Sequence, residues 1–183
     1  MKKSVTRLTF NAALVAVYIV LSMPMFTLRF GGFKLTFEHF PVVLGAIMFG
    51  PIDGMLIGLV GEFINQLTTF GITPTTILWV LPIMARGAIV GFGTYLFPTM
   101  KVEVFTRRTV PLVFAIVCVV SGVVSSCLNT LALYCDSKLF GYYTYALVFG
   151  SLLVRLLLSA ITSIMIVVVI TPILRALKQA KLI

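Results

Sequence analysis

Long apolar runs, separated by short polar or Gly/Pro-rich segments, fill most of this chain of 183 residues. Uninterrupted apolar runs of this length favour membrane-spanning helices. We predict six helices, over residues 6–26, 39–49, 52–70, 75–98, 109–134 and 143–176. The second is too short to cross a bilayer alone, because about twenty residues are needed. The expected fold is an all-α integral membrane protein with six transmembrane helices, forming one domain over residues 1–183.

The segment between the first two predicted helices has a different pattern. Residues 28–38 alternate apolar and polar side chains on each side of Gly31-Gly32. A period of two around a Gly-Gly pair predicts a small β-hairpin, and the alternative is an ordered amphipathic loop. An isolated hairpin is only marginally stable in water, so we expect this one to pack over the helix ends.

Composition and charge placement support a membrane protein. The chain is 60% hydrophobic and 10% charged, which is far less polar than a soluble domain. Its net charge of +9 would suit nucleic acid, but the charges cluster at the ends of the predicted spans, where they face lipid and water. With a cytoplasmic N-terminus, most basic residues outside the spans fall on the cytoplasmic side. We therefore predict that both termini are cytoplasmic and that no nucleic acid is bound.

The beginning of the chain has the charge order of a signal peptide. Lys2, Lys3 and Arg7 precede an apolar run that starts at Leu8. The run continues to about residue 26, and no small-residue cleavage site follows it. We interpret this segment as a retained first helix.

Three ionisable residues, Glu62, Arg86 and Arg155, lie inside predicted spans. A charge near the bilayer centre costs about 2.5–3.5 kcal/mol on insertion scales. Such groups persist where they line a cavity, pair with one another or bind a polar ligand. If Glu62 paired with one arginine as a purely structural contact, the other arginine would be left as an unmatched buried charge. Arg86 could instead form a structural pair or a conformational latch.

Other polar and aromatic residues are expected beside these three. Glu62, Asn65 and Gln66 share one helical face because they are three and four residues apart. Trp79 shares a stripe with Arg86, although a lone Trp is also typical of the membrane interface. The candidate substrate-binding residues are Lys34, Glu38, His39, Glu62, Asn65, Gln66, Trp79, Arg86, Asn129 and Arg155. We predict that they converge in the outer half of the membrane, beneath the hairpin, as a small-molecule site.

Catalysis, metal and cofactor chemistry are not indicated. The sequence has no HExxH, GxSxG or P-loop motif and no usable pair of carboxylates. Its three cysteines form no CxxC, and His39 is its single histidine, so we expect no metal site and no cofactor. The polar residues occupy one half of the membrane, which favours a binding cup over a channel or an ion-coupled carrier.

Several features together resemble a known family. These are six helices in about 180 residues, a basic N-terminus, the Ala12-xxx-Ala16 stripe, and the P-x-x-x-G-x-x-x-x-G-P stretch from Pro41 to Pro51. They resemble the substrate-binding S components of energy-coupling factor (ECF) vitamin transporters, most strongly across residues 9–98. The resemblance implies a non-catalytic subunit of a bacterial cell membrane that binds a water-soluble vitamin in an outward-facing cup covered by loops.

The resemblance also implies partners. S components associate with a transmembrane T component and two ATPase subunits, whose ATP hydrolysis drives toppling of the S component and inward release of the vitamin. The family's AxxxA surface contacts the T component, which assigns that role to Ala12 and Ala16.

The vitamin itself is less clearly indicated. The Gly-Pro turn and residues 71–79 loosely resemble the folate-type branch, so the expected ligand is folate-like. Glu62 would accept from a pterin, Trp79 would stack on it, and an arginine or Lys34 would pair with the glutamate. Pantothenate, pyridoxine and hydroxymethyl-pyrimidine are alternatives that need fewer groups. The alternatives from other classes are a self-sufficient secondary carrier and a structural membrane protein.

Overall fold

The computed structural model describes the backbone of residues 2–26, 28–30, 33–35, 37–97, 100 and 110–179, and the side chains within 5–26, 37–97, 100 and 112–176. The helices in this part of the chain are α1 (Lys2–Ser22), α2 (Phe40–Phe49), α3 (Pro51–Phe70), α4 (Thr76–Leu96), α5 (Val110–Leu139), α6 (Tyr145–Val148) and α7 (Leu152–Gln179). A short 3₁₀ helix, Pro24–Phe26, follows α1. The architecture is therefore built from helices, as the apolar runs predict.

Four described segments are long and apolar enough to cross a membrane. They are Val5–Ser22, Thr76–Leu96, Leu112–Leu139 and Tyr145–Ala176. As expected, α2 is a shorter apolar helix. Helix α3 is long enough to span, but residues such as Asp53 and Glu62 lower its hydropathy. The several apolar helices are those of a multi-pass membrane protein, with α3 as its most polar long helix.

Several predicted helix boundaries differ from the structure, and three of the differences have a clear local cause. The first helix ends at Ser22 rather than at 26, because Pro24 cannot continue the helical hydrogen bonds. Helix α5 continues to Leu139 rather than ending at 134, and its last polar turn contacts neighbouring segments instead of forming a loop. The helix predicted over 143–176 is interrupted after Val148, so a single-turn α6 precedes α7.

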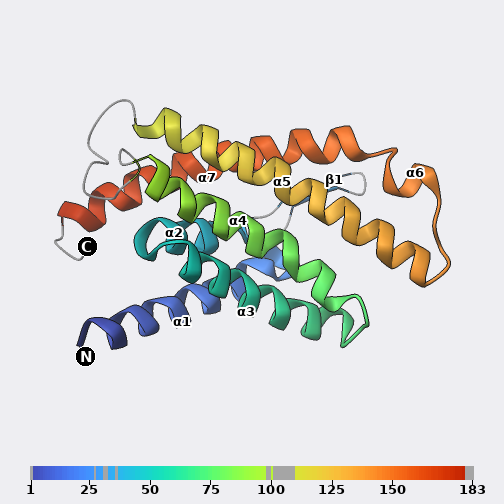
Figure 1. The fold of residues 1–183 in the computed structure, drawn as a ribbon, viewed down its shortest axis with the longest axis horizontal. Helices are drawn as coiled ribbons and strands as arrows, with labels where there is room; N and C mark the ends of the chain where they lie inside the picture. Colours follow the sequence, from blue (N-terminus) through green and yellow to red (C-terminus); the bar gives the residue numbers. More distant parts are fainter. Residues whose placement is uncertain are drawn as a thin grey trace.

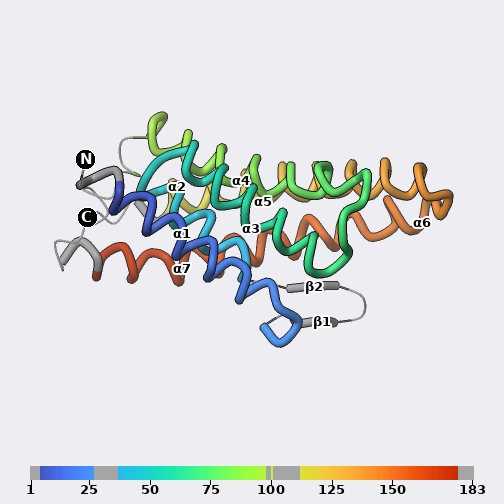
Figure 2. Tube along the Cα trace, turned by 90° about the horizontal axis from the view of Figure 1, so that it is seen from below, coloured from blue at the N-terminus to red at the C-terminus, as the bar shows by residue number. Residues whose placement is uncertain are grey.

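The helices lie side by side in an elongated bundle (Figure 1). Helix α3 packs against α1, α2 and α4, and α5 packs against α4 and α7. The beginning of α1 and the end of α7 lie at the same end of the bundle in both views (Figures 1 and 2). We call this the terminal end; the α3–α4 turn and the α5–α6 connection lie at the opposite end (Figure 1). Which end faces the cytoplasm stays a prediction.

Glycines allow the helices to approach closely where the bundle is densest. A Cβ on Gly87 of α4 would lie 2.5 Å from the carbonyl oxygen of Gly54 on α3, and one on Gly61 of α3 would lie 2.6 Å from the ring of Tyr18. Gly50 has a positive φ of 99° and joins α2 to α3, with Pro51 as the first residue of α3. These contacts fix α3 against α1, α2 and α4.

A charged cluster ties α1 to α3 at the terminal end. Asp53, in the first turn of α3, forms an ion pair with Arg7 of α1. Its Oδ1 also accepts from Arg7 Nε at 2.9 Å and from Asn11 Nδ2 at 2.5 Å. Arg7 Nη2 donates in addition to the carbonyl oxygen of Phe49 at the end of α2, 3.2 Å away. Arg7 is thus part of a specific contact as well as a basic residue near the start of the chain.

Two short strands lie between α1 and α2, in the segment for which we expect a hairpin or an ordered loop. Strand β1 (Leu28–Phe30) pairs antiparallel with β2 (Phe33–Leu35), with Arg29 opposite Lys34. Strand β2 contacts α7. Gly31-Gly32 and the side chains of both strands lie outside the described residues.

A second polar cluster fastens the end of the bundle opposite the termini. The carboxylate of Asp136 on α5 accepts from the hydroxyls of Thr75, before α4, and of Tyr142, after α5. This acceptor raises the pKa of the Tyr142 hydroxyl to about 12. The Lys138 ammonium lies 4.3 Å from the centre of the Tyr143 ring. The last turn of α5 is therefore held by contacts on both of its flanks.

Candidate functional site

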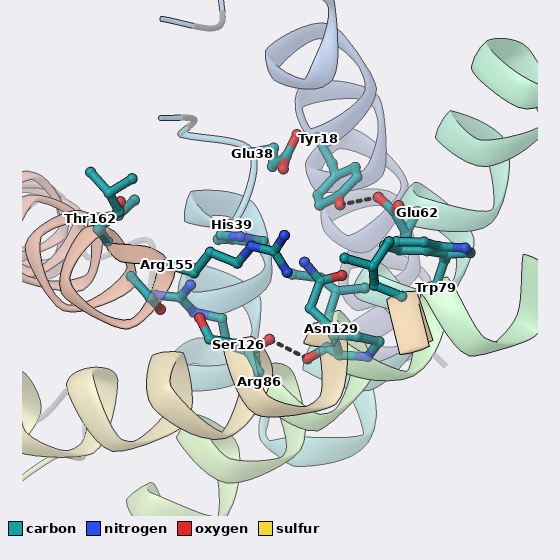
Figure 3. Close-up of a pocket in the computed structure, with 16 residues that line it drawn as sticks. Tyr18, Glu38, His39, Glu62, Trp79, Arg86, Ser126, Asn129, Arg155 and Thr162 are labelled. Atoms are coloured by element: carbon teal, nitrogen blue, oxygen red, sulfur yellow. Dashed lines mark hydrogen bonds between the residues drawn. The ribbon is translucent and has the colours of Figure 1, made fainter. Parts of the chain in front are cut away.

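A cavity of about 430 Å³ lies among the helices and is lined from six parts of the chain (Figure 3). Its polar and aromatic lining comes from α1, the segment before α2, α3, α4, α5 and α7: Tyr18, Glu38, His39, Glu62, Trp79, Arg86, Ser125, Ser126, Asn129, Arg155, Ser159 and Thr162. Pro82, Ile83, Leu133 and Leu158 complete the wall. Its volume and mixed lining are typical of a small-molecule site.

Glu62 is held in place by neutral donors. Its Oε2 accepts from the Tyr18 hydroxyl at 2.6 Å and from Asn65 Nδ2 at 3.0 Å, and its Oε1 accepts from Gln66 Nε2 at 2.6 Å. Tyr18 is 1% exposed and rests against Gly61, so its hydroxyl has a fixed position. The carboxylate is therefore oriented by hydrogen bonds from groups that leave its negative charge unmatched.

Arg86 is the most deeply buried charged side chain of the site, with 1% of its surface exposed. Its Nη2 donates to the hydroxyl of Ser163 on α7 at 2.8 Å, and that hydroxyl donates to the Ser159 carbonyl oxygen at 2.7 Å. Its Nε is buried and has no acceptor among the described atoms. Gly122 on α5 makes room here, because a Cβ would lie 2.5 Å from the Ser163 hydroxyl.

Arg155 approaches the cavity from α7 and is partly exposed. Its Nη2 donates to the carbonyl oxygen of Leu147 in α6 at 3.2 Å. In the view of Figure 3 its side chain extends towards the middle of the cavity, while Glu62 and Trp79 lie on the other side. Arg155 thus joins the short α6 to the cavity wall.

No ion pair connects these groups. Among the described side chains, the ion pair is between Arg7 and Asp53, outside the cavity, and neither Arg86 nor Arg155 lies within ion-pairing distance of Glu62. The alternative in which Glu62 and an arginine form a structural pair is therefore not the arrangement of this structure. Two guanidinium groups and the Glu62 carboxylate line one cavity without neutralising one another.

The structure brings seven of the ten predicted substrate-binding residues to the cavity wall: Glu38, His39, Glu62, Trp79, Arg86, Asn129 and Arg155. Asn65 and Gln66 are not part of the lining; they donate to Glu62 and orient it. The side chain of Lys34 lies outside the described residues. Whether the lining residues bind a ligand stays a prediction.

Several residues of the lining were not expected from the sequence, although two of them, Ser159 and Thr162, share a helical face with Arg155. Arg155, Ser159 and Thr162 are four and three residues apart and therefore share one face of α7. This spacing could have predicted Ser159 and Thr162 beside Arg155. Tyr18 gave no such signal, because its partner Glu62 is 44 residues away in the sequence. The serines of α5 stand in an apolar run, where small residues are common in membrane helices.

The described residues hold no group of three or more His, Cys, Asp or Glu side chains that would suit a metal ion. The three cysteines are free thiols, and Cys118 is buried. An oriented carboxylate, two guanidinium groups, hydroxyls and one indole ring face a shared space, an arrangement that can bind a polar small molecule.

Comparison with known proteins identifies the family. The family model described as "ECF transporter, substrate-specific component" matches residues 6–175, which is nearly the whole chain. A search of curated proteins finds no match. The match covers all the lining residues of the cavity and both alanines of the α1 stripe. The chain belongs to the family of substrate-specific components of ECF transporters, and it is a substrate-binding subunit of a membrane transporter.

Proposed function

We propose that this chain captures a water-soluble vitamin in the cavity described above, with a folate-like molecule as the preferred ligand. The observation that carries the proposal is the convergence of charged, polar and aromatic side chains on one cavity of about 430 Å³, in which Glu62 forms no ion pair with Arg86 or Arg155. Buried charges that are not matched within the protein favour a polar ligand that matches them.

A folate-like ligand suits the groups that are present. The Glu62 carboxylate would accept from the amino and ring N–H groups of a pterin, and the Trp79 indole would stack on the ring. A guanidinium group would pair with a carboxylate of the glutamate portion. Pantothenate would use mainly the arginines, whereas pyridoxine or hydroxymethyl-pyrimidine would use mainly Glu62 and Trp79.

The proposed transport cycle needs partners. The chain would dock on a transmembrane T component with two ATPase subunits, and their ATP hydrolysis would topple it and release the vitamin into the cytoplasm of a bacterial cell. Ala12 and Ala16 are exposed on α1, whereas Leu14 and Tyr18 are buried against the bundle. An exposed small-residue face would let the T component approach closely.

Trp79 provides the first experiment, since it is the sole tryptophan of the chain and lines the cavity. The purified protein is titrated with water-soluble vitamins while the Trp79 emission is followed. We expect a saturable change with one vitamin, and folate is the first to test. A folded protein whose emission responds to no vitamin, and whose thermal stability no vitamin raises, would contradict the proposal.

Reconstitution separates an S component from a self-sufficient carrier. Proteoliposomes with this chain alone should not accumulate the vitamin, whereas adding the T component, the ATPases and ATP should start uptake. Ala12→Leu and Ala16→Leu should prevent uptake without changing vitamin binding, and Ala13→Leu, on a neighbouring face of α1, is the matched control. Uptake by the chain alone, driven by an ion gradient, would support the carrier instead.

A further inference from the structure

The guanidinium group of Arg86 is a buried cation that forms no ion pair with any described residue; the Glu38 carboxylate acts on it electrostatically but lies beyond ion-pairing distance. Its described hydrogen bond is to a neutral hydroxyl, that of Ser163, and its Nε is buried without an acceptor. The side chain is 1% exposed, yet it forms part of the cavity lining. A buried charge in this state costs free energy until an anion reaches it.

Arg86 lies far along the cavity from the residues nearest the end of the bundle opposite the termini. It is two turns beyond Trp79 on α4, roughly 10 Å along the helix axis. Its partner Ser163 is a little more than two turns beyond Arg155 on α7, roughly 12 Å along the axis. The cavity therefore extends from the level of Trp79 and Arg155 towards Arg86, and we call the region around Arg86 its inner end.

Hydroxyl groups accompany Arg86 at the inner end. Ser159, one turn before Ser163, and Ser126 of α5 line the same cavity. Neither hydroxyl has a hydrogen-bond partner among the described residues, whereas the Thr162 hydroxyl donates to the Leu158 carbonyl. A guanidinium group flanked by hydroxyl donors is a suitable environment for an oxyanion.

The Glu62 carboxylate is not positioned to pair with the Arg86 guanidinium. Both of its oxygens accept from Tyr18, Asn65 and Gln66, which hold it on the wall formed by α1 and α3. Glu38 also lines the cavity, where the chain enters α2. Glu62 and Arg86 are thus positioned to bind different parts of one ligand.

We propose that Arg86 makes an anionic group obligatory in the ligand: a carboxylate binds at the inner end, against Arg86 and the hydroxyls, while a part of the ligand rich in N–H donors binds Glu62 beside Trp79. This deepens the proposed function and rests on it. It predicts the orientation of the ligand, with the anionic end innermost. It also predicts the ligand class, because a neutral or cationic vitamin leaves Arg86 unmatched.

The test compares pairs of related ligands, one with a carboxylate and one without. Folate is paired with 6-hydroxymethylpterin, pantothenate with pantothenol, nicotinate with nicotinamide, and biotin with biotinamide; riboflavin, pyridoxine and thiamine complete the panel. Binding to the purified wild-type chain is followed by Trp79 emission and by calorimetry. We expect the tightest ligand to be an acid that binds at least about 100-fold more tightly than its neutral partner.

Variants then assign the preference to Arg86. Arg86→Gln should lower the affinity for the acid to that of its neutral partner, and should leave the neutral partner nearly unaffected. Arg86→Lys should restore part of the preference. Arg155→Gln is the matched control: Arg155 is partly exposed and already bound to a backbone carbonyl, so its loss should reduce the preference without abolishing it.

The outcomes distinguish this inference from the proposed function. If riboflavin, pyridoxine, thiamine or a neutral partner binds most tightly, the inference is overturned while vitamin binding stands. An acid preference that survives in folded Arg86→Gln also overturns it. If Arg86→Gln does not fold, the ligand pairs on the wild-type chain still decide the matter. If no vitamin binds the folded wild-type chain, both proposals fail.

Discussion

The charges at the terminal end of the bundle and those in the cavity are arranged in opposite ways. At the terminal end Asp53 meets Arg7 in an ion pair and accepts a further bond from Asn11. In the cavity Glu62 is bound by a hydroxyl and two carboxamides, and Arg86 by a hydroxyl. The Arg7 and Asp53 charges are paired with each other, whereas neutral groups orient Glu62 and Arg86 and leave their charges without an ion-pair partner among the described residues.

This contrast separates structural charges from functional ones in a membrane protein. An ion pair between α1 and α3 contributes to holding those helices together, and it needs no further partner. An oriented but unmatched charge in a cavity is costly to the empty protein and becomes favourable when a ligand of opposite charge binds. We therefore expect substitutions at the two places to change different measured quantities.

Beside the Arg86→Gln change described above, Glu62→Gln should weaken vitamin binding most. The amide keeps the shape of the side chain but removes its charge, and it brings donors where Asn65 and Gln66 already donate. We expect the affinity for the vitamin to fall about 100-fold. Calorimetric titration measures it, with circular dichroism to show that the helices remain. An unchanged affinity in a folded variant would assign Glu62 to structure.

Asp53→Asn is the matched change at the terminal end, and its effect should be on stability. It removes the charge that binds Arg7, so we expect the free energy of unfolding to fall by about 2 kcal/mol. Because Asp53 is not part of the cavity, vitamin affinity should stay within about twofold of the wild type. Denaturant unfolding in detergent micelles checks the first result. A large loss of vitamin affinity in the folded variant would contradict the assignment of Asp53 to structure alone.

Tyr18→Phe tests whether the orientation of Glu62 matters. It removes the 2.6 Å hydrogen bond while leaving the ring against Gly61. We expect about a tenfold loss of vitamin affinity, the equivalent of one good hydrogen bond to a charged group. Tyr142→Phe, which removes a donor to Asp136 outside the cavity, is the control and should leave the affinity unchanged. Equal effects of the two variants would argue against a role for the orientation of Glu62.

Asn65→Ala should change the vitamin affinity least among these substitutions around Glu62. Its hydrogen bond to Glu62 is longer, at 3.0 Å, and Tyr18 still donates to the same oxygen. We expect about a threefold loss of affinity, measured by the same titration. A loss larger than that of Tyr18→Phe would indicate that Asn65 touches the ligand itself.

The sequence was a good guide to features that depend on local pattern. The apolar runs predict the helices, and the charges inside them predict a polar site, because both follow from the cost of placing polar groups in lipid. The i, i+3 and i+4 spacing places Glu62, Asn65 and Gln66 on one face. That pattern does not tell which of the three faces the cavity, so Asn65 and Gln66 were expected in the lining.

Contacts between distant segments could not be predicted in this way. Tyr18 meets Glu62 across 44 residues, and Arg86 meets Ser163 across 77. Both contacts depend on how closely the helices pack. Gly61 and Gly122 allow this close packing, but the sequence alone does not show which helix lies against each glycine. The break between α6 and α7 falls within an apolar run and leaves little trace in the hydrophobic pattern.

The decisive measurement is a structure of the chain with its vitamin bound, which gives the distances from the vitamin to the Glu62 carboxylate and to the Arg86 guanidinium. We expect the vitamin inside the cavity, with N–H donors in hydrogen-bonding distance of the Glu62 carboxylate and a carboxylate against the Arg86 guanidinium. The Arg7–Asp53 pair should be unchanged. A vitamin bound outside the cavity, with Glu62 turned to pair with Arg86 or Arg155, would contradict the account.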